Sequence, residues 1–243
     1  NGNDITLSTL GKLTITGGVT VNATGGSASS SSGGDGVAVN WGNIEISGAT
    51  LHAVSGTSNT NSASIGIEAS YPASDKSKGG NITIIDSTVT ATGDSNVPIF
   101  GGRGIYSDNN LTIQNSSVTV QGGGSITNSG GIGLFSNAGN IVISGGTVTA
   151  TGGNGSINGA HAVYADKGII TVSNGATLTA VGGNGGTGLG GVGVRAVGND
   201  GSVLNGNTVT IANSAGDVYI RGGQGVSAQR ASVMGKDVYI GTG

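Results

Sequence analysis

The chain has 243 residues, 52 of them glycine, with a net charge of −3, 9% charged residues and 3% aromatic residues. Its pI is about 5.1 and its Lys and Arg residues form no cluster, which argues against a nucleic-acid-binding protein. The composition is too apolar and too periodic for a disordered Gly/Ser segment, so we expect a folded chain. The absence of cysteine fits bacterial extracellular proteins and many cytosolic ones alike.

Two short runs of alternating apolar and polar residues recur together along the chain, followed by glycines. The apolar pairs of the first run return at steps of 29 to 39 residues: Leu13/Ile15, Ile44/Ile46, Ile82/Ile84, Leu111/Ile113, Ile141/Ile143, Ile170/Val172 and Val209/Ile211. Those of the second run are Val21/Ala23, Leu51/Ala53, Val89/Ala91, Val118/Val120, Val148/Ala150, Leu178/Ala180 and Val218/Ile220. A third run closes most repeats: Val37/Val39, Ile65/Ile67, Ile105, Ile132/Leu134, Val163 and Val192/Val194. A repeat of this length is typical of a solenoid, in which each unit packs on its neighbours.

The period of two makes each run a strand with one apolar and one polar face. We therefore predict an all-β fold, a right-handed parallel β-helix of about seven coils of roughly 30 residues with three strands per coil. Apolar residues at helical spacing are missing, and the many β-branched residues disfavour helix. An antiparallel propeller or sandwich is the alternative, but it requires two-residue hairpin turns that the gaps between runs do not provide.

We predict one domain over residues 1–243, with coils near 11–41, 42–79, 80–108, 109–138, 139–167 and 168–207 and a degenerate or capping coil at 208–243. The longer steps place insertions at residues 71–79, 94–102 and 197–207. After Ile220 the pattern weakens, because residues 217–220 are echoed by residues 237–240 at a step of only 20. The chain begins at Asn1 without methionine and has neither a signal peptide nor a membrane-spanning apolar run, so we expect a segment of a longer protein.

One column of asparagines precedes the first strands: Asn43, Asn81, Asn110 and Asn140. Asparagine tolerates a left-handed backbone. Its amide can also hydrogen-bond to the same amide in the next coil, as in the ladders of stacked strands. We expect this column to have a structural role.

The outer face of the third strands departs from the Thr and Ser found elsewhere. With these strands aligned on their inward residues, the next position reads Asn40, Glu68, Tyr106, Phe135, Tyr164 and Arg195, and two residues further on lie Asp108, Asn137 and Asp166. Flat rings about 4.8 Å apart can carry the apolar face of a sugar, while carboxylates and amides bind its hydroxyls. The same rings can instead stack on one another or lie under a neighbouring loop.

The carboxylates of this face could also serve glycoside hydrolysis or Ca²⁺ binding. Asp108 and Asp166 would lie about 9.6 Å apart, near the upper limit for inverting glycosidases, but nothing nearby is apolar enough to raise one carboxyl pKa. With Asn137 they could offer oxygen ligands to Ca²⁺, although a hard-cation site gathers more carboxylate. We therefore predict no catalytic residue, no metal and no cofactor, and a candidate glycan face made of Glu68, Tyr106, Asp108, Phe135, Asn137, Tyr164, Asp166 and Arg195.

Two other motifs match known functional repeats only in part. Residues 182–187 resemble the start of a calcium-binding nonapeptide repeat, but Thr187 stands where Asp is required. Thr-x-Thr in the second strands resembles the ice-binding face of some antifreeze proteins, although Asn22, His52 and Tyr219 interrupt the column.

The two histidines, His52 and His161, belong to different columns, and neither has partners for a metal site or a triad. Arg103 shares the column of His161, and we expect the adjacent loop to leave it solvated.

The phrase Gly-Asn-Ile-Thr-Ile followed by Thr-Val-Thr-Ala-Thr-Gly occurs at residues 80–93, with near copies at 139–152 and 168–182. It resembles Gly-rich repeats in large surface proteins of anaerobic bacteria. Those proteins look like right-handed β-helices of the pectin-lyase-like type and are usually described as adhesin-like or carbohydrate-binding. The resemblance covers residues 4 to 223 and implies architecture more than activity, because the same helix carries lyases, hydrolases, adhesins and passive stalks. The acidic and basic clusters of the lyases are not matched.

These observations predict a non-enzymatic adhesin-like or structural module, secreted or on the surface of a bacterium. Its expected partner is a host or dietary glycan or a surface protein, with no nucleic acid and no membrane insertion by this chain. The alternative is a polysaccharide-degrading enzyme, a lyase or glycoside hydrolase of the pectin-lyase-like fold.

Overall fold

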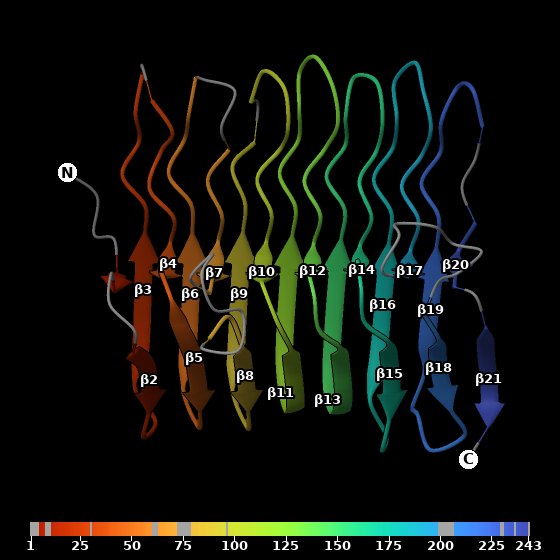
Figure 1. Cartoon of the computed structure of the whole chain (residues 1–243), viewed down its shortest axis with the longest axis horizontal. Helices are drawn as coiled ribbons and strands as arrows, with labels where there is room; N and C mark the ends of the chain where they lie inside the picture. Colours follow the sequence, from red (N-terminus) through yellow and green to blue (C-terminus); the bar gives the residue numbers. More distant parts are fainter. Residues whose placement is uncertain are drawn as a thin grey trace.

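The computed structural model describes residues 5–7, 11–29, 31–59, 63–71, 79–95, 97–198, 207–228, 231–235 and 237–242. These residues contain strands and no helix. The strands stack side by side along one axis, from the N-terminal to the C-terminal end (Figure 1). They form a 13-stranded and an 8-stranded sheet, and strands of successive coils pair in parallel.

The larger sheet holds the predicted first and second strands. The first strands are β2 (Gly11–Thr16), β5 (Gly42–Ser47), β8 (Ile82–Ile85), β11 (Leu111–Gln121), β13 (Ile141–Thr151), β15 (Ile170–Ser173), β18 (Val209–Ala212) and β21 (Val238–Thr242). The second strands are β3 (Thr20–Thr24), β6 (Thr50–Val54), β9 (Thr88–Thr92), β16 (Thr177–Val181) and β19 (Val218–Arg221). In the middle coils the two runs are one continuous strand, since β11 and β13 span both.

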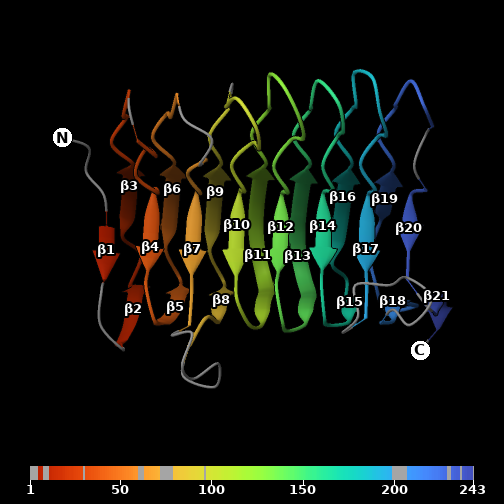
Figure 2. The same cartoon turned by 45° about the horizontal axis from the view of Figure 1, so that its top comes forward.

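The smaller sheet holds the third strands, which are shorter. They are β1 (Ile5–Leu7), β4 (Val37–Val39), β7 (Ile67–Ala69), β10 (Ile105–Ser107), β12 (Leu134–Ser136), β14 (Val163–Ala165), β17 (Val194–Ala196) and β20 (Val233–Met234). In Figure 2 this nearer sheet points down and the farther strands β3, β6 and β9 point up while the chain advances from left to right. That winding is right-handed, and the predicted β-helix of about seven coils is confirmed.

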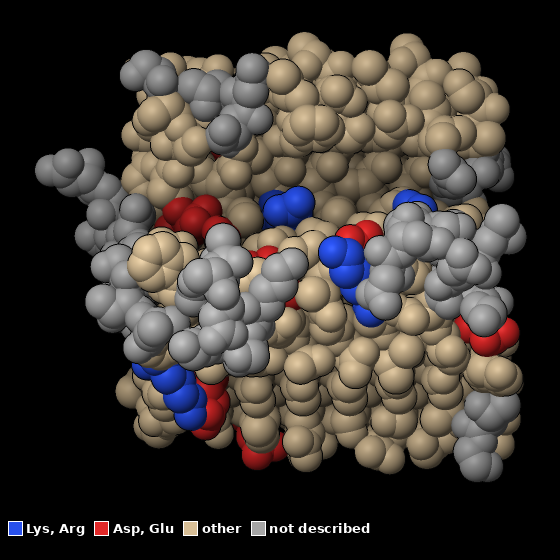
Figure 3. All heavy atoms as spheres, viewed as in Figure 1, with Lys and Arg blue, Asp and Glu red and all other residues tan. Residues whose placement is uncertain are grey.

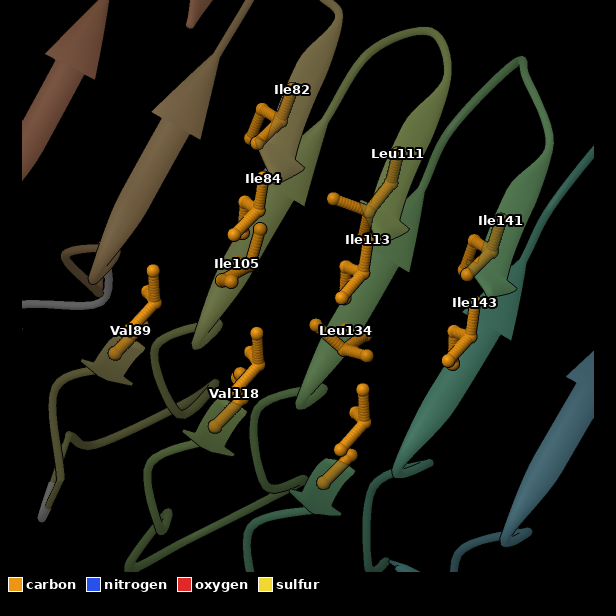
Figure 4. Close-up of a cluster of buried hydrophobic side chains, with 14 of the residues drawn as sticks. Ile82, Ile84, Val89, Ile105, Leu111, Ile113, Val118, Leu134, Ile141 and Ile143 are labelled. Atoms are coloured by element: carbon orange, nitrogen blue, oxygen red, sulfur yellow. The ribbon is translucent and has the colours of Figure 1, made fainter. Parts of the chain in front are cut away.

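The core fills the space between the sheets. The apolar pairs predicted for the first and second strands stack in register from coil to coil. In the middle coils they are 0 to 1% exposed, and the side chains of Ile84, Ile113 and Ile143 follow one another along the axis (Figure 4). Alternating inward aliphatic and outward polar residues therefore place one face of each sheet in the core.

The corner between first and second strands has a left-handed backbone in six of the seven coils. Gly17, Gly48, Asp86, Asn115, Gly145 and Asn174 occupy it with φ between 47° and 81°. Glycine has no Cβ to clash there, and Asn and Asp are the side chains that tolerate this region best. This explains why the corner residues vary only among Gly, Asn and Asp.

The predicted asparagine ladder is present. The Oδ1 atom of Asn43 accepts from Asn81 Nδ2 at 2.8 Å, and Asn81 Oδ1 accepts from Asn110 Nδ2 at 3.2 Å. Asn110 Oδ1 accepts the backbone N–H of Asn140 at 2.9 Å. Each side chain thus satisfies a backbone donor or an amide of the next coil, which fixes the register.

Glycine-rich segments link six of the second strands to the next third strand, and their described residues project together as what we call the loop stack (residues 25–29, 31–36, 55–59, 63–66, 93–95, 97–104, 122–133, 152–162 and 182–193). Isolated bridges join these segments from coil to coil. The prediction of an insertion at 94–102 is wrong, because β9 to β10 spans the same length as β11 to β12. The other two predicted insertions follow third strands, and most of their residues lie outside those described.

The weakened pattern after Ile220 is explained by the pairing. Strand β19 belongs to the second-strand column beside β16, whereas β21 pairs with the first strand β18. The two similar phrases at 217–220 and 237–240 therefore occupy different columns, and the coil pattern continues through β20 and β21.

Candidate functional site

The outer residues of the third strands lie in one register, as predicted. Glu68 pairs with Tyr106, Tyr106 with Phe135, Phe135 with Tyr164, and Tyr164 with Arg195. Asp108, Asn137 and Asp166 follow two residues after the three rings. We call these eight residues the third-strand strip; the structure brings all of them to one face.

The first coil is shifted relative to the prediction. Val37 pairs with Ile67, which places Ala38 rather than Asn40 beside Glu68. The same shift moves Asp35 into register with Ile65. The column that borders the strip therefore reads Asp35, Ile65, Arg103, Ile132, His161 and Val192.

The rings of the strip stack on one another. The centroids of Phe135 and Tyr164 are 5.2 Å apart with nearly parallel planes, and those of Tyr106 and Phe135 are 5.4 Å apart and tilted. Arg103 covers the rings of Tyr106 and Phe135, with its Cζ 4.8 Å from both centroids. Arg103 is half-buried, and this burial lowers the pKa of its guanidinium. The faces of these two rings are consequently occupied by the protein itself.

The carboxylates of the strip are held by their neighbours. Asp108, 7% exposed, accepts from the Tyr106 hydroxyl, from Asn137 Nδ2 at 3.0 Å and from the Tyr71 N–H at 3.1 Å. Asp166 accepts from the Tyr164 hydroxyl at 2.6 Å. Burial, and then these bonds, raise the pKa of both tyrosines. The aspartates therefore orient the rings, and we assign them no acid or base role.

A second pair of carboxyl groups lies at the N-terminal end of the strip. Glu68 shares a hydrogen bond with Asp35, and burial followed by the charge of Asp35 raises the pKa of Glu68 to about 8, against an opposing effect of Arg103. Asp35 Oδ1 also accepts the N–H of Ile65 at 2.6 Å. At neutral pH Glu68 is thus mostly protonated and donates to Asp35. The raised pKa on this face is thus at Glu68, whereas the expectation from the sequence concerned only the carboxyls of Asp108 and Asp166.

His161 and Arg195 form the other end of the site. Arg195 Nη1 lies 2.8 Å from His161 Nε2, and the N–H of Val192 donates to His161 Nδ1 at 2.9 Å. The guanidinium lies over the ring of Tyr164, with Cζ 5.3 Å from its centroid, and His161 meets the edge of the same ring. Among the described residues Arg195 forms no ion pair with a carboxylate, so its charge remains available to a ligand.

A groove runs between the strip and the loop stack. One cavity of about 350 Å³ is lined by residues that include Asn158, His161, Tyr164 and Arg195. A second, of about 320 Å³, lies beside Phe100, Arg103 and other residues of the loop stack, and both cavities are lined by Gly130 and Ile132. Figure 3 shows this face hollowed across its middle, with charged side chains of both signs along the hollow.

The side chains of the groove are better suited to binding a ligand through hydrogen bonds than to catalysing a reaction. No group of three or more His, Cys, Asp or Glu residues gathers among the described residues as a metal site would require. Asn, His, Tyr and Arg side chains supply donors and acceptors, and the Tyr164 ring supplies an apolar edge. Cavities of this size suit one or a few small rings.

Three residues of the site were missed at the sequence level. Arg103 and His161 share a column with Ile132 and Val192. This mixture of polar and apolar residues obscured the fact that both polar side chains contact rings of the strip. Asp35 was missed because the predicted register of the first coil was shifted. The signal that could have found them is the small residue that follows this column in all six coils, glycine at positions 36, 66, 104, 133 and 193 and alanine at 162.

The fold and the site define the class of this protein as a parallel β-solenoid with a grooved outer face. Comparisons with protein-family models, with curated proteins and with solved structures found no match. The described residues include no helix that is long and apolar enough to cross a bilayer.

Proposed function

We propose that this chain is a non-enzymatic, extracellular or cell-surface structural module of the adhesin-like kind that binds a glycan in the groove beside the third-strand strip. The observation that carries the proposal is the 350 Å³ cavity, where Tyr164 offers a ring edge and Asn158, His161 and Arg195 offer polar groups. Sugars are recognised by such a combination of ring contact and hydrogen bonds. The regular Thr, Ser, Asn and Gly surface elsewhere suits an exported rod.

The contacts of the rings indicate which residues of the strip could contact a glycan. Phe135 is only 6% exposed and lies under Arg103, so a sugar cannot stack on it. Tyr164 lines the larger cavity, whereas Tyr106 lines neither cavity. The glycan face expected from the sequence thus narrows to its C-terminal half.

A glycan array containing neutral and carboxylate-bearing oligosaccharides tests the proposal. We expect wild type to bind a defined set, Tyr164→Ala to lose it, and Tyr106→Ala to retain it. Circular dichroism of both variants checks the fold. Absence of wild-type binding to every glycan would remove carbohydrate recognition and leave a purely structural module.

A polysaccharide-degrading enzyme is the second candidate, and one observation favours it. The pKa of Glu68 is raised to about 8, by burial and then by the neighbouring Asp35 carboxyl, as the pKa of a general acid beside a second carboxyl would be. The direct hydrogen bond between them disfavours glycoside hydrolysis, since the two carboxyls of those enzymes are about 5 to 9.5 Å apart. Release of reducing sugar from polysaccharides by wild type but not by Glu68→Gln would establish the enzyme.

A further inference from the structure

The loop stack has one outgoing and one returning position per coil at its base, and in five of the six coils a backbone hydrogen bond joins the two. The outgoing positions are Gly26, Gly56, Asp94, Gly123, Gly153 and Gly183; the returning positions are Gly34, Ser64, Gly102, Gly131, Ala160 and Gly191. The N–H of Gly131, for example, donates to the carbonyl of Gly123 at 2.8 Å. We call these twelve residues the neck.

Glycine is required at the outgoing positions because the coils approach closely. A Cβ at Gly123, Gly153 or Gly183 would lie 1.6 to 1.9 Å from a carbonyl oxygen of the preceding coil. Asp94 is the exception among the outgoing positions, and Ser64 is the one polar side chain among the returning positions. The backbones of the two exceptions are adjacent, since the N–H of Asp94 donates to the carbonyl of Ser64 at 3.1 Å.

Both polar side chains are buried without partners. Asp94 is 3% exposed and Ser64 is 2% exposed. Neither carboxylate oxygen of Asp94 has a hydrogen-bond partner, and the same holds for Ser64 Oγ. Burial raises the pKa of the Asp94 carboxyl to about 6, and the backbone amides of Ser58 and Ser95, which lie close to it but outside hydrogen-bonding geometry, partly offset that rise.

An ionised carboxylate without a partner is strongly disfavoured in such a place. The described residues offer it no Lys, Arg or His, because the one ion pair among them joins Lys12 to Glu45 elsewhere. An ordered water or an ion from solution can compensate it. Two unpartnered, buried oxygen donors in neighbouring coils, amid the carbonyls of the neck, are the ligands that hard cations prefer.

We propose that Asp94 and Ser64 bind one hard cation, Ca²⁺ in the first instance, between the second and third coils. This site is separate from the groove and does not depend on the proposed function. With one carboxylate the affinity should be low, with a Kd of about 10⁻⁴ to 10⁻³ M, the range of extracellular calcium modules. The cation would join the loops of two coils and stabilise the N-terminal part of the loop stack.

Thermal unfolding of the full chain, dialysed against EDTA and then choline chloride buffer, tests the site. Addition of 10 mM CaCl₂ should raise the Tm of wild type by about 3 to 5 °C. NaCl and MgCl₂ arms identify the ion, and Mg²⁺ should act least because it retains its water shell. Isothermal titration calorimetry gives the Kd directly.

The chain offers a matched control. Asp94→Gly installs the residue that the other coils have at this position, so it should fold normally. It should be at least as stable as wild type without cation, and its Tm should not respond to Ca²⁺. Ser64→Gly should fold and bind Ca²⁺ about tenfold more weakly, as expected for one lost ligand. A wild-type Tm that no cation raises, or an equal rise in Asp94→Gly, would overturn the proposal.

Discussion

The outer faces of the second and third strands share one backbone repeat but use their side chains differently. On the second strands Thr90, Thr119, Thr149 and Thr179 stack in register, as residues that suit any exposed strand. On the third strands each side chain has a particular partner in its own or the next coil, as Tyr106 has in Asp108 and Phe135. Regular backbone geometry thus supports both a uniform face and a differentiated one.

The difference teaches where to look for function in a repeat protein. A face whose residues follow local propensity can lose one of them at little cost. On a face whose residues contact one another between coils, the loss of one residue also disturbs its partners. The following predictions separate the two faces, beginning with the largest effect.

The two faces share one core, so substitutions beneath them should be equally costly. Leu178, beneath the threonines, and Leu134, beneath the strip, are both fully buried at 0% exposure. Replacement of either by alanine should lower the free energy of unfolding by about 2 to 5 kcal/mol, through lost burial and the cavity left behind. Urea denaturation measures both. A large loss at only one site would mean that the faces differ in the core as well.

The second prediction compares the faces themselves. Asp108→Ala leaves the Tyr106 hydroxyl and the Asn137 amide without an acceptor, and should cost about 1 to 3 kcal/mol. Thr119→Ala on the exposed second-strand face should change stability by no more than about 0.5 kcal/mol. Equal losses in denaturant would show that the strip is no more interdependent than the threonine face.

The third prediction concerns pH and Glu68. The folded state raises the pKa of this carboxyl from 4.5 to about 8, so the folded protein holds the proton more tightly than the unfolded chain. The resulting stabilisation is complete below about pH 4.5 and is lost as the pH rises through about 8, an effect on the order of 1 to 2 kcal/mol.

Glu68→Gln is the control for this titration, because it keeps the hydrogen bond to Asp35 but has no proton to lose. The difference in Tm between wild type and Glu68→Gln should grow between pH 5 and 9 in favour of the variant. A constant difference across that range would exclude Glu68 as the titrating group.

The smallest effect is expected at Arg103. Its guanidinium lies over two rings, so Arg103→Ala should cost about 0.5 to 2 kcal/mol and expose Phe135. Arg103→Lys should recover only part of this, since an ammonium cannot stack flat. Full recovery by lysine would show that charge, and not the planar contact, holds the rings.

Most of the fold follows from the sequence because its signals are local and repeated. Apolar pairs such as Ile44/Ile46 recur with the period of a strand and predicted both the columns and the core. The column that contains Asn81 and Asn110 predicted the ladder, because identical amides that stack in register can hydrogen-bond to one another. The fusion of two predicted strands in β11 was not visible, since it depends on pairing on both sides.

The third-strand site was harder to predict. Its third strands are only two or three residues long, and at Val37 and Val39 two equally apolar residues allowed a shift in register, so that Asp35 was missed. Residues 94–102 were predicted to be an insertion, although the step from Ile82 to Leu111 is an ordinary 29 residues. The contact of Arg103 with Tyr106 and Phe135 depends on how the loop stack leans over the sheet, which no local pattern encodes.

The central claim is that the strip, and not the threonine face, forms the binding surface. The most direct test is the affinity of the best array glycan for wild type, Tyr164→Ala and Thr149→Ala, measured by calorimetry. Tyr164 and Thr149 are both half-buried, outward residues of the same coil. We predict at least a tenfold weaker Kd for Tyr164→Ala, about 1.4 kcal/mol, and no change for Thr149→Ala. Equal affinity of all three proteins, or a loss confined to Thr149→Ala, would contradict the account.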